Sequence, residues 1–302
     1  MTSQDGSGTS RTQFRALLAC LRPEQWTKNL LVFAALIFAQ KLLVVGLVLR
    51  AVAAFVVFCA ASSACYLVND VLDAPRDRSH PAKCRRPVAS GELPATVALV
   101  AAAALAIAAM VGGLVLSVRF GGVVAAYLVL QIAYSLFLKH EVILDVLCIA
   151  AGFLLRASGG AVVIEVEISN WLVICAGLLS LFLALAKRRH ELLQLEGAVN
   201  HRRALAEYSP QLLDQMIAVV TASTLVAYSL YTMAPETVTK FGHDHLKLTI
   251  PFVLFGIFRY LYLVYSKEQG GSPSQHLLTD RPLLIDVFLF AVVSAWIVSR
   301  PH

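Results

Sequence analysis

The chain alternates between long apolar runs and short polar segments, and most of its charges lie in the polar segments. An apolar run of roughly 20 residues is long enough for one helix to cross the hydrocarbon core of a bilayer. Gln40 and Lys41 interrupt the first of these runs. The pattern predicts nine membrane-spanning helices. We expect them to cover residues 30–48, 50–68, 94–116, 120–138, 142–163, 170–187, 212–232, 248–266 and 283–300.

The composition agrees with a membrane protein. The mean hydropathy is +0.73, and 58% of the residues are hydrophobic whereas only 15% are charged, which is far from the usage of soluble domains. Residues 1–29 contain no apolar stretch followed by a cleavage site, so we expect no removable signal peptide. We therefore predict an all-α integral membrane protein, with a cytoplasmic N-terminal segment at 1–29 and a single polytopic domain at 30–302.

The positions of Lys and Arg predict which side of the membrane each polar segment occupies, because these residues are enriched in cytoplasmic loops. With a cytoplasmic N-terminus, 17 of the 25 Lys and Arg residues lie in inner segments, 6 in outer segments and 2 within spans. The polar segment after the second span is then cytoplasmic. The net charge of +6 follows from the same bias and from attraction to anionic lipid, so we expect no nucleic-acid partner.

The most informative polar segment follows the second predicted span and combines acidic with amide side chains. Within nine residues it contains Asn69, Asp70, Asp73 and Asp77. Oxygen ligands of this kind suit Mg²⁺, which takes one or two carboxylates together with substrate phosphates. The segment therefore indicates a Mg²⁺-bridged diphosphate that is handled at a membrane surface. The alternative is a solvated acidic loop without chemistry.

The spacing of these residues predicts their geometry. Asn69, Asp73 and Asp77 are spaced i, i+4 and i+8, so on a helix they would form one stripe, and we expect them to hold the metal. Asp70 would point about 100° away and would either orient the others or assist the metal. Pro75 should end or kink the helix one residue earlier, which would bring Asp77 in from a bent segment.

A basic cluster follows the acidic segment directly. It contains Lys83, Arg85 and Arg86, and Lys and Arg are the usual partners of phosphate oxygens. Lys28 belongs to a second basic segment, Arg-Pro-x-Gln-Trp-x-Lys-Asn at 22–29. Because a Trp and several cations here precede the first span, the segment is either a membrane anchor or a lid over a phosphate site.

Two further polar groups lie at the predicted cytoplasmic ends of spans. Tyr134 and Lys139 follow the fourth span and would suit a phosphate, but an interfacial tyrosine and a snorkelling lysine are equally ordinary there. Lys187 and Arg188 follow the sixth span, where adjacent cations satisfy the positive-inside rule without any catalytic role. Glu191 is four residues beyond Lys187, so it could pair with that lysine on a helix or assist the metal.

Arg156 lies well inside an apolar span, where a charge without a partner is costly. We therefore expect it to face a polar cavity or a partner such as Asp145. Arg259 in the eighth span presents a weaker form of the same argument.

Together these residues resemble the UbiA superfamily of intramembrane prenyltransferases. Asn69-Asp70-x-x-Asp73-x-x-x-Asp77 is similar to the first aspartate motif of that family, and Tyr-Ser-x-x-Leu-Lys at 134–139 is similar to another of its signatures. The nine-span plan extends the resemblance over nearly the whole chain. The resemblance implies a bundle of transmembrane helices around a central cavity, and Mg²⁺-dependent handling of a diphosphate.

One departure from the family pattern is informative. Members that prenylate an aromatic ring usually have a second aspartate-rich motif after the sixth span, whereas residues 187–191 here read Lys-Arg-Arg-His-Glu. This basic sequence resembles the branch of the superfamily that transfers a phosphoribosyl group to a polyprenyl phosphate. The segments at 22–29, 83–87 and 186–188 are similar to that branch as well.

This resemblance implies transfer of the 5-phosphoribosyl group from 5-phosphoribosyl 1-diphosphate to a polyprenyl phosphate such as decaprenyl phosphate, with release of diphosphate. It also implies a multi-pass protein of the bacterial plasma membrane that serves the synthesis of arabinose donors for the cell envelope. A homo-oligomer would be compatible with this role. Because the two substrates present three phosphorylated positions, their site should contain more cations and fewer acids than a prenyl diphosphate site.

The resemblance also implies a role for each candidate side chain. The residues expected at the catalytic centre are Asn69, Asp70, Asp73 and Asp77, of which Asn69, Asp73 and Asp77 would bind Mg²⁺. The residues expected to bind the phosphoribosyl diphosphate are Lys28, Lys83, Arg85, Arg86, Lys187 and Arg188. Those expected to bind the lipid phosphate are Tyr134, Lys139 and Arg156. A phosphate oxygen is already anionic at neutral pH, so its attack on ribose C1 requires no general base.

Two other functions fit parts of the pattern. An aromatic prenyltransferase of the same superfamily would use an aromatic ring as acceptor, and the missing second aspartate motif argues against it. A transporter or channel for an anionic solute would explain Arg156 and Arg259, but the chain shows no inverted repeat and the acidic motif would have no role. A soluble phosphoribosyltransferase is excluded, because the chain lacks an α/β pattern and a Gly-rich phosphate loop.

Overall fold

The chain is entirely helical in the part that the structure describes. A computed structural model describes residues 6–81, 83–167, 170–194, 207–267 and 279–299, and no strand occurs among them. The chain divides into two compact units. Unit 1 comprises Met1–Lys139 and Leu155–Glu167, and unit 2 comprises His140–Leu154 and Ile168–His302. Helix α7 (Leu144–Val163) contributes its first half to unit 2 and its second half to unit 1.

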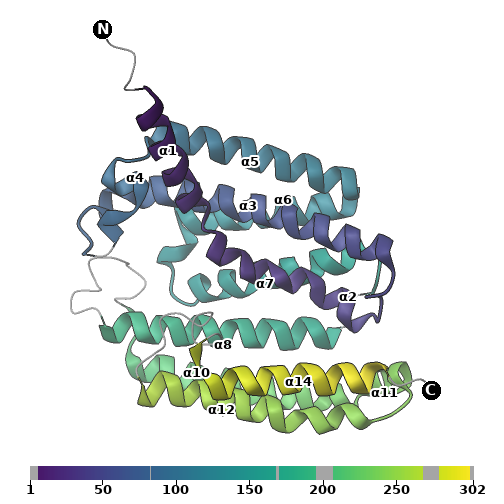
Figure 1. Cartoon of the computed structure of the whole chain (residues 1–302). Helices are drawn as coiled ribbons and strands as arrows, with labels where there is room; N and C mark the ends of the chain where they lie inside the picture. Colours follow the sequence, from purple (N-terminus) through teal and green to yellow (C-terminus); the bar gives the residue numbers. More distant parts are fainter. Residues whose placement is uncertain (1–5, 82, 168–169, 195–206, 268–278, 300–302) are drawn as a thin grey trace. The chain divides into compact units, whose positions relative to one another are not determined.

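Unit 1 is built on α3 (Val45–Asp77), a helix of 33 residues. Two apolar helices, α5 (Ala95–Leu116) and α6 (Val118–Leu136), pack along it (Figure 1). Two short elements, η2 (Lys83–Arg85) and α4 (Pro87–Ser90), lie between α3 and α5 in the chain. The end of α3 therefore lies next in sequence to the basic segment at 83–86.

Small residues allow α5 and α6 to approach closely. The Cα of Gly121 lies 3.3 Å from the position that a Cβ on Gly113 would take, so any larger side chain would push the helices apart. Ser117 begins α6, and its hydroxyl accepts a hydrogen bond from the backbone N–H of Phe120 at 3.0 Å. This bond satisfies one of the donors that every helix N-terminus exposes.

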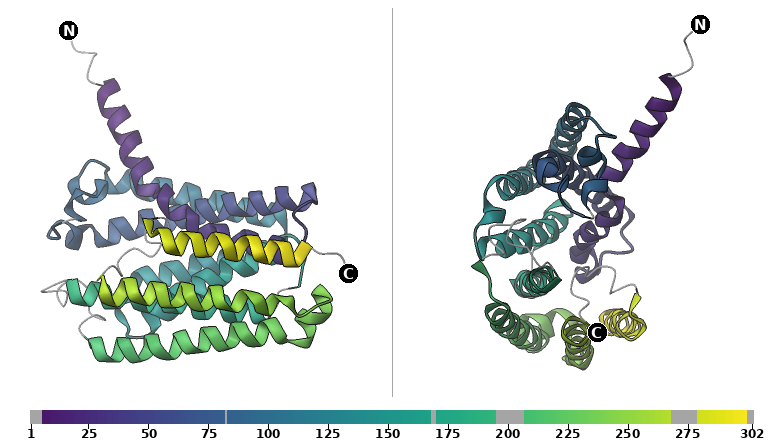
Figure 2. Two further views of the ribbon diagram at one scale, coloured as in Figure 1. Left: turned by 60° about the horizontal axis from the view of Figure 1, so that its bottom comes forward. Right: turned by 90° about the vertical axis from the view of Figure 1, so that its left-hand side faces the viewer.

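The N-terminal part of unit 1 consists of α1 (Gly6–Leu21), the 3₁₀ helix η1 (Pro23–Phe33) and α2 (Ala34–Phe38). Arg22 lies between the first two elements with a φ of 53°, which turns the chain sharply. Figure 2 shows α1 leaving the packed helices of unit 1 at a steep angle. The side chains of η1 lie against α3, so the polar residues of the segment at 22–29 contact that helix.

The first two predicted spans are wrong in their boundaries. Residues 30–48 form no single helix, because they contain the end of η1, then α2, a turn at residues 39–44 and the start of α3. The predicted span at 50–68 is only the middle of α3. Arg50 therefore lies inside α3 and not between two spans, with its guanidinium 2.8 Å from Glu165.

Seven described segments are long and apolar enough to cross a membrane. α8 (Asn170–Gln194) has 25 residues and also exceeds the length that a bilayer requires. The predicted count of nine spans is therefore not confirmed, although the segments after residue 94 lie close to their predicted places. The seven are α3, α5, α6, α7, α10 (Pro210–Met233), the segment His245–Ser266 and Arg281–Val298 of α14.

Unit 2 contains α8 and α10, which pack together, and the pair α12 (Ile250–Ser266) and α14 (Arg281–Ser299). The short elements α11 (Pro235–Phe241) and η5 (His245–Thr249) connect α10 to α12. Ser209 caps α10 by accepting from the N–H of Leu212 at 3.1 Å, and Pro210 follows as the first helical residue, a position where its missing N–H costs nothing.

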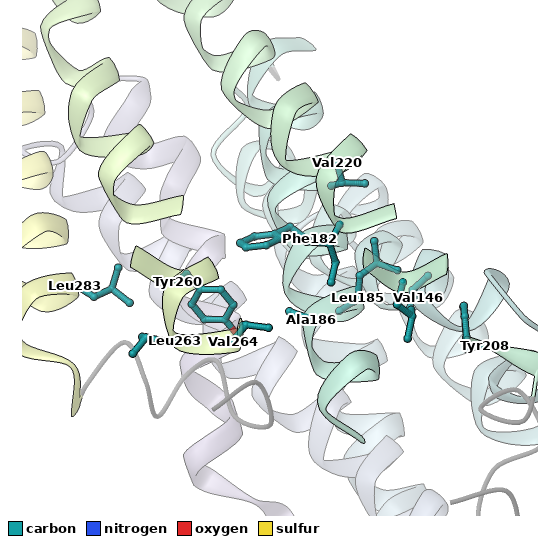
Figure 3. Close-up of a cluster of buried hydrophobic side chains, with 13 residues drawn as sticks. Val146, Phe182, Leu185, Ala186, Tyr208, Val220, Tyr260, Leu263, Val264 and Leu283 are labelled. Carbon is teal, nitrogen blue, oxygen red and sulfur yellow. The ribbon is translucent and has the colours of Figure 1, made fainter. Parts of the chain in front are cut away.

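A large hydrophobic core joins several helices of unit 2. It combines residues of α7, α8, α10, α12 and α14, and Figure 3 shows that Phe182 and Tyr260 belong to it. Their rings meet edge to face with centroids 5.3 Å apart, an arrangement that aromatic pairs favour. The core therefore fixes the end of α8 that carries Lys187 and Arg188. The labelled members are Val146, Phe182, Leu185, Ala186, Tyr208, Val220, Tyr260, Leu263, Val264 and Leu283.

Candidate active site

The acidic segment Asn69–Asp77 forms the last nine residues of α3. The helix continues through Pro75 to Asp77, so the prediction that this proline ends the helix one residue earlier is wrong. Proline removes the hydrogen bond that its own N–H would donate to the carbonyl of Val71. Beyond it, the N–H of Arg78 still bonds to the carbonyl of Ala74 at 3.2 Å. All four polar side chains of the segment therefore extend from one continuous helix.

Asp70 and Asp77 lie seven residues apart, on the same side of α3, and both bind arginine. The carboxylate of Asp70 accepts from the guanidinium of Arg22 and, at 3.4 Å, from that of Arg86. Arg86 also donates to Asp77 at 2.7 Å. Both residues are less than 5% exposed. A buried carboxylate without a partner is strongly unfavourable, and the two arginines supply the opposite charge.

Asn69 and Asp73 lie four residues apart and share a different cation. The amide nitrogen of Asn69 donates to Asp73 Oδ2 at 2.9 Å. Lys139 lies in the 3₁₀ helix η3 (Leu138–His140), which follows α6. It is only 4% exposed, and its Nζ lies 2.7 Å from Asp73 Oδ1 and 3.5 Å from Asn69 Oδ1. The structure thus groups Asp77 with Asp70, and not with the other two members of the predicted stripe.

We refer to these side chains together as the α3 cluster. It contains three carboxylates and three cations, so its formal charge is zero when all six are ionised. All of its residues belong to unit 1. The cluster consists of Asn69, Asp70, Asp73, Asp77, Arg22, Arg86 and Lys139.

The donor atoms of the α3 cluster suit a hard divalent cation. Among the residues that the structure describes, no three His, Cys, Asp or Glu side chains gather so as to hold a metal ion by themselves. However, Asn69 Oδ1 and Asp73 Oδ1 both face the ammonium of Lys139, so two oxygens converge on one cation. Mg²⁺ needs few protein ligands, because it keeps water and takes substrate phosphate oxygens. The residues present therefore fit Mg²⁺ that arrives with a phosphorylated substrate.

Arg156 is the centre of a second buried polar group in unit 1. Its Nε donates to Asn29 Oδ1 at 2.6 Å, and its Nη2 donates to the hydroxyl of Tyr127 at 2.7 Å. The amide nitrogen of Asn29 donates in turn to Ser62 at 3.3 Å. Asp145, suggested from the sequence as one possible partner, bonds to Arg188 and Tyr208. The bonds of the Arg156 guanidinium to Asn29 in η1 and to Tyr127 in α6 are to neutral groups.

The segment at 22–29 is fixed to α3 by several bonds. The indole N–H of Trp26 donates to Ser63 at 3.1 Å, and the hydroxyl of Ser63 donates to the carbonyl of Leu21 at 3.0 Å. A Cβ on Gly160 of α7 would collide with the carbonyl of Val32, so η1 also packs tightly against α7. Arg22 and Asn29 thereby reach the α3 cluster and Arg156, respectively.

Unit 2 has its own buried ion pair at the end of α8. Arg188 donates from Nε to Asp145 at 2.6 Å and also binds Glu191. Asp145 accepts a further bond from the hydroxyl of Tyr208 at 2.8 Å. Burial raises the pKa of Tyr208 above its ordinary value, which keeps the hydroxyl protonated as a donor. Arg188 is 2% exposed, so this predicted substrate ligand is bound within the protein.

The neighbours of Arg188 lie closer to the surface. Lys187 is half-buried and lies 3.9 Å from Glu191, as the spacing predicted. Arg189 lies over the ring of Tyr265 at 4.1 Å from its centroid and donates to Asp214 at 2.6 Å. The basic run is therefore interleaved with acids and an aromatic ring that come from other parts of unit 2.

The remaining predicted site residues lie at the surface or partly buried. Lys83 and Arg85 are exposed in η2, next to the cluster member Arg86. Lys28 in η1 and Tyr134 in α6 are both half-buried. Arg259, which the sequence placed in the eighth span, binds Asp280 through two bonds of 2.8 and 3.1 Å.

Several functional side chains were not assigned from the sequence. Arg22 and Asn29 lie in a segment that the sequence singled out, but their partners are 48 and 127 residues away along the chain. Tyr127 lies inside an apolar helix without any neighbouring motif. Tyr208 lies in a polar segment with no distinctive spacing. Among these four, only Arg22 and Asn29 had a signal, namely their place in a basic segment directly before an apolar run.

Comparison with known proteins identifies relatives along nearly the whole chain. Residues 29–278 match the sequence model of the UbiA prenyltransferase family. The decaprenyl-phosphate phosphoribosyltransferase of Mycolicibacterium smegmatis is 33% identical over 307 residues, which cover 98% of this chain and 94% of that protein. The protein of the same name from Corynebacterium glutamicum is 34% identical over 293 residues, covering 92% and 86%.

Solved structures share the fold. A UbiA homolog from Archaeoglobus fulgidus, bound to GPP and Mg²⁺, superposes with a TM-score of 0.71 at 18% identity, and the match covers 94% of this chain and 100% of that one. The same homolog bound to DMAPP and Mg²⁺ also gives a TM-score of 0.71. At this identity the likeness concerns the fold alone.

Proposed function

Since the chain belongs to the UbiA prenyltransferase family, we propose that it is a membrane enzyme that transfers a phosphoribosyl group. In this reaction the 5-phosphoribosyl group of 5-phosphoribosyl 1-diphosphate passes to a polyprenyl phosphate such as decaprenyl phosphate, and diphosphate is released. The relatives that carry this activity in their names match the chain over more than nine-tenths of its length. The length of the polyprenyl chain is not part of the proposal.

The observation that carries this proposal is the α3 cluster. It brings carboxylates, an amide and cations together at the end of one helix, which is the combination that a metal-bound diphosphate requires. The basic run at 187–189 supports a donor and an acceptor that both carry phosphate, in contrast to a neutral aromatic acceptor.

Both the acidic and amide side chains and the cations of the α3 cluster would bind the donor diphosphate. Asn69 and Asp73, with Asp77 or Asp70 in support, would hold Mg²⁺, which when bound supplies positive charge to the departing diphosphate. Arg86 and the exposed pair at 83 and 85 would donate to phosphate oxygens, as would Lys28. These cations stabilise the negative charge that develops as the bond between ribose C1 and the diphosphate breaks.

The lipid phosphate would be positioned by Tyr134, Lys139 and Arg156. Its anionic oxygen attacks ribose C1 as that carbon becomes oxocarbenium-like, so the chain needs no side chain that removes a proton. The contribution of these three residues is to hold the oxygen in line with the departing diphosphate, and positioning of this kind is a large part of transfer catalysis. The bonds from Asn29 and Tyr127 fix the orientation of the Arg156 guanidinium.

The basic run of α8 would act in two ways. Lys187 is half-buried and would contact a donor phosphate. Arg188 is bound by Asp145 and Glu191, so we assign it a positioning role at the end of α8 in place of direct contact. We place the enzyme in the bacterial plasma membrane, with its N-terminus and the α3 cluster on the cytoplasmic side, where its water-soluble donor would be found.

A transfer assay with purified protein in lipid vesicles tests this function. Phosphoribosyl diphosphate labelled in the ribose is offered with polyprenyl phosphate and Mg²⁺, and label is counted in the lipid fraction. We expect label in lipid with the wild type, loss of the signal with EDTA, and a decrease of at least about 100-fold with Asp73→Asn, since a neutral amide binds Mg²⁺ and orients Lys139 poorly.

Glu165→Gln is the matched control, because it also neutralises one carboxylate of unit 1, at an exposed ion pair with Arg50. It should keep the wild-type rate. Absence of label in lipid, together with prenylation of an aromatic acid by a prenyl diphosphate, would reject the proposal in favour of an aromatic prenyltransferase.

A further inference from the structure

Lys139 occupies the place in the α3 cluster where a bound cation would be expected. Its Nζ lies 2.7 Å from Asp73 Oδ1 and 3.5 Å from Asn69 Oδ1, and the side chain is almost fully buried. The two oxygens that best suit a metal ion therefore already face an ammonium, which neutralises the charge of Asp73. The remaining carboxylates, Asp70 and Asp77, are neutralised separately by arginines.

This arrangement makes it difficult for a metal ion to bind alone. A divalent cation at Asn69 and Asp73 would have to displace the ammonium of Lys139, which would then be a buried charge without a partner, and such charges are strongly unfavourable.

The same reasoning applies to a diphosphate that arrives alone. Its oxygens would attract Lys139 and Arg86 away from Asp73 and Asp77, and the carboxylates left behind would repel it. When metal and diphosphate arrive together, every buried charge keeps an opposite partner, because the carboxylates pass to the metal and the cations pass to the phosphate oxygens.

We propose that Lys139 is an exchangeable counter-ion that couples metal binding to diphosphate binding. It neutralises Asp73 and faces Asn69 until both ligands are present, and its ammonium then donates to a diphosphate oxygen, in place of the lipid phosphate assigned to it above. Each ligand therefore strengthens the binding of the other by the same factor. The inference deepens the proposed function, but it depends only on a diphosphate in the substrate and not on the identity of the transferred group.

Equilibrium dialysis of the purified full-length protein tests the coupling without any catalytic turnover. Radioactive Mn²⁺ serves as the metal probe and inorganic pyrophosphate as the diphosphate probe, and protein-bound metal is measured at fixed free concentrations. For the wild type we expect pyrophosphate to tighten Mn²⁺ binding by roughly tenfold or more, the effect expected for one close charge pair. Equal Mn²⁺ affinity with and without pyrophosphate would overturn the proposal.

A substitution at Lys139 is expected to strengthen Mn²⁺ binding and not to weaken it. Lys139→Met should tighten the binding of Mn²⁺ alone by roughly tenfold and reduce the effect of pyrophosphate, because the competing ammonium is gone. A lysine that serves only structure or catalysis would give unchanged or weaker Mn²⁺ binding, and that outcome would contradict the proposal. Lys139→Gln, which keeps a hydrogen-bond donor, should act in the same direction if the methionine variant does not fold.

Lys41→Met is the matched control. Lys41 is exposed and precedes the opposite end of α3, roughly 40 Å along the helix from Asp73. It should leave both affinities unchanged. If the coupling is observed while the vesicle assay shows no phosphoribosyl transfer, the proposed donor is wrong and the counter-ion role of Lys139 stands. Phosphoribosyl transfer without coupling between metal and pyrophosphate binding would support the proposed donor and reject the counter-ion role of Lys139.

Discussion

At the scale of single residues, the candidate site depends on buried charged side chains that fix one another. Arg156 has two short hydrogen bonds to neutral partners, and the guanidinium also lies over the ring of Tyr127, 4.8 Å from its centroid. Arginine can satisfy two partners at once because its donors form a rigid planar fork. The identity of the side chain is therefore as important here as its charge.

Arg156→Lys tests this requirement. Lysine keeps the charge but cannot donate to Asn29 and Tyr127 with the same geometry, so we expect kcat/KM for the polyprenyl phosphate to fall by at least about tenfold. Steady-state kinetics in vesicles measures the effect. Arg50→Lys, in an exposed ion pair, is the control and should remain within about twofold of the wild type. Unchanged kinetics of Arg156→Lys would show that the charge alone is sufficient.

Cys20 reports on the packing of α1. Burial, and secondarily the nearby carboxylate of Asp70, raises the pKa of Cys20 from 9.0 to about 11, so the thiolate is scarce below that pH. We expect its alkylation by iodoacetamide, followed by mass spectrometry of the peptide, to rise about tenfold per pH unit from pH 7 to about 9.5 without levelling off. A plateau near pH 9, as in the denatured chain, would contradict the burial of this thiol.

At the scale of secondary-structure elements, the structure shows how the ends of helices are held. The end of α8 is fixed by the ion pair between Arg188 and Asp145, whose side chains are 2% and 0% exposed. One residue further, Arg189 pairs with Asp214, which is 38% exposed. The two pairs have the same chemistry and differ in burial.

Asp145→Asn and Asp214→Asn therefore form a matched comparison. Removing the charge of Asp145 leaves a buried guanidinium without its main partner, and we expect a loss of about 3–5 kcal/mol in the free energy of unfolding. The loss for Asp214→Asn should be about 1 kcal/mol or less, because water solvates the exposed partner. Denaturant titration in detergent measures both. Equal losses would show that burial does not determine the contribution of the pair.

Gly160 tests the contact between η1 and α7. A Cβ at this position would collide with the backbone carbonyl of Val32, which cannot rotate away, so we expect Gly160→Ala to lower the free energy of unfolding by about 1–3 kcal/mol. Gly122→Ala in α6 is the control, since no atom lies within 4 Å of its Cβ position. The midpoint of thermal unfolding should be lower for Gly160→Ala than for the wild type. It should not be lower for Gly122→Ala, because alanine has a higher helix propensity than glycine.

The sequence predicted some of these elements well, for physical reasons that the structure makes clear. The apolar runs after residue 94 became helices close to their predicted places, because length and hydropathy are sufficient to identify a span. The start of α3 was misplaced because the apolar residues 42–48 were assigned to the preceding span, although Gln40 and Lys41 lie in the turn at 39–44. Pro75 was expected to end or kink the helix near Ala74, but α3 continues to Asp77.

The site was predictable only in part. The motif Asn69–Asp77 and the cations at 86 and 139 were identified from spacing and residue type. Their pairing was not, because it depends on how α3, α6 and η1 pack. Asn29 and Tyr127 are polar residues without a chemical signature, and only the structure brings them to Arg156.

At the scale of the whole molecule, the chain is a helical membrane protein of the UbiA family whose polar groups are concentrated in two sets. The α3 cluster and the Arg156 group belong to unit 1, and the group around Arg188 belongs to unit 2. The α3 cluster and the group around Arg188 pair acids with bases, whereas Arg156 binds the neutral side chains of Asn29 and Tyr127. A protein that binds two phosphorylated substrates requires many cations, and their pairing with acids allows them to be buried in the absence of substrate.

The central claim is that the donor is a phosphoribosyl diphosphate and the acceptor a lipid phosphate. One competition experiment tests it directly. Purified protein in vesicles receives phosphoribosyl diphosphate, polyprenyl phosphate, a prenyl diphosphate and an aromatic acid together with Mg²⁺, and the products are identified by mass spectrometry. The account predicts a polyprenyl phosphate that has gained one phosphoribosyl group, absent with Asp73→Asn. A prenylated aromatic acid without any phosphoribosylated lipid would contradict it.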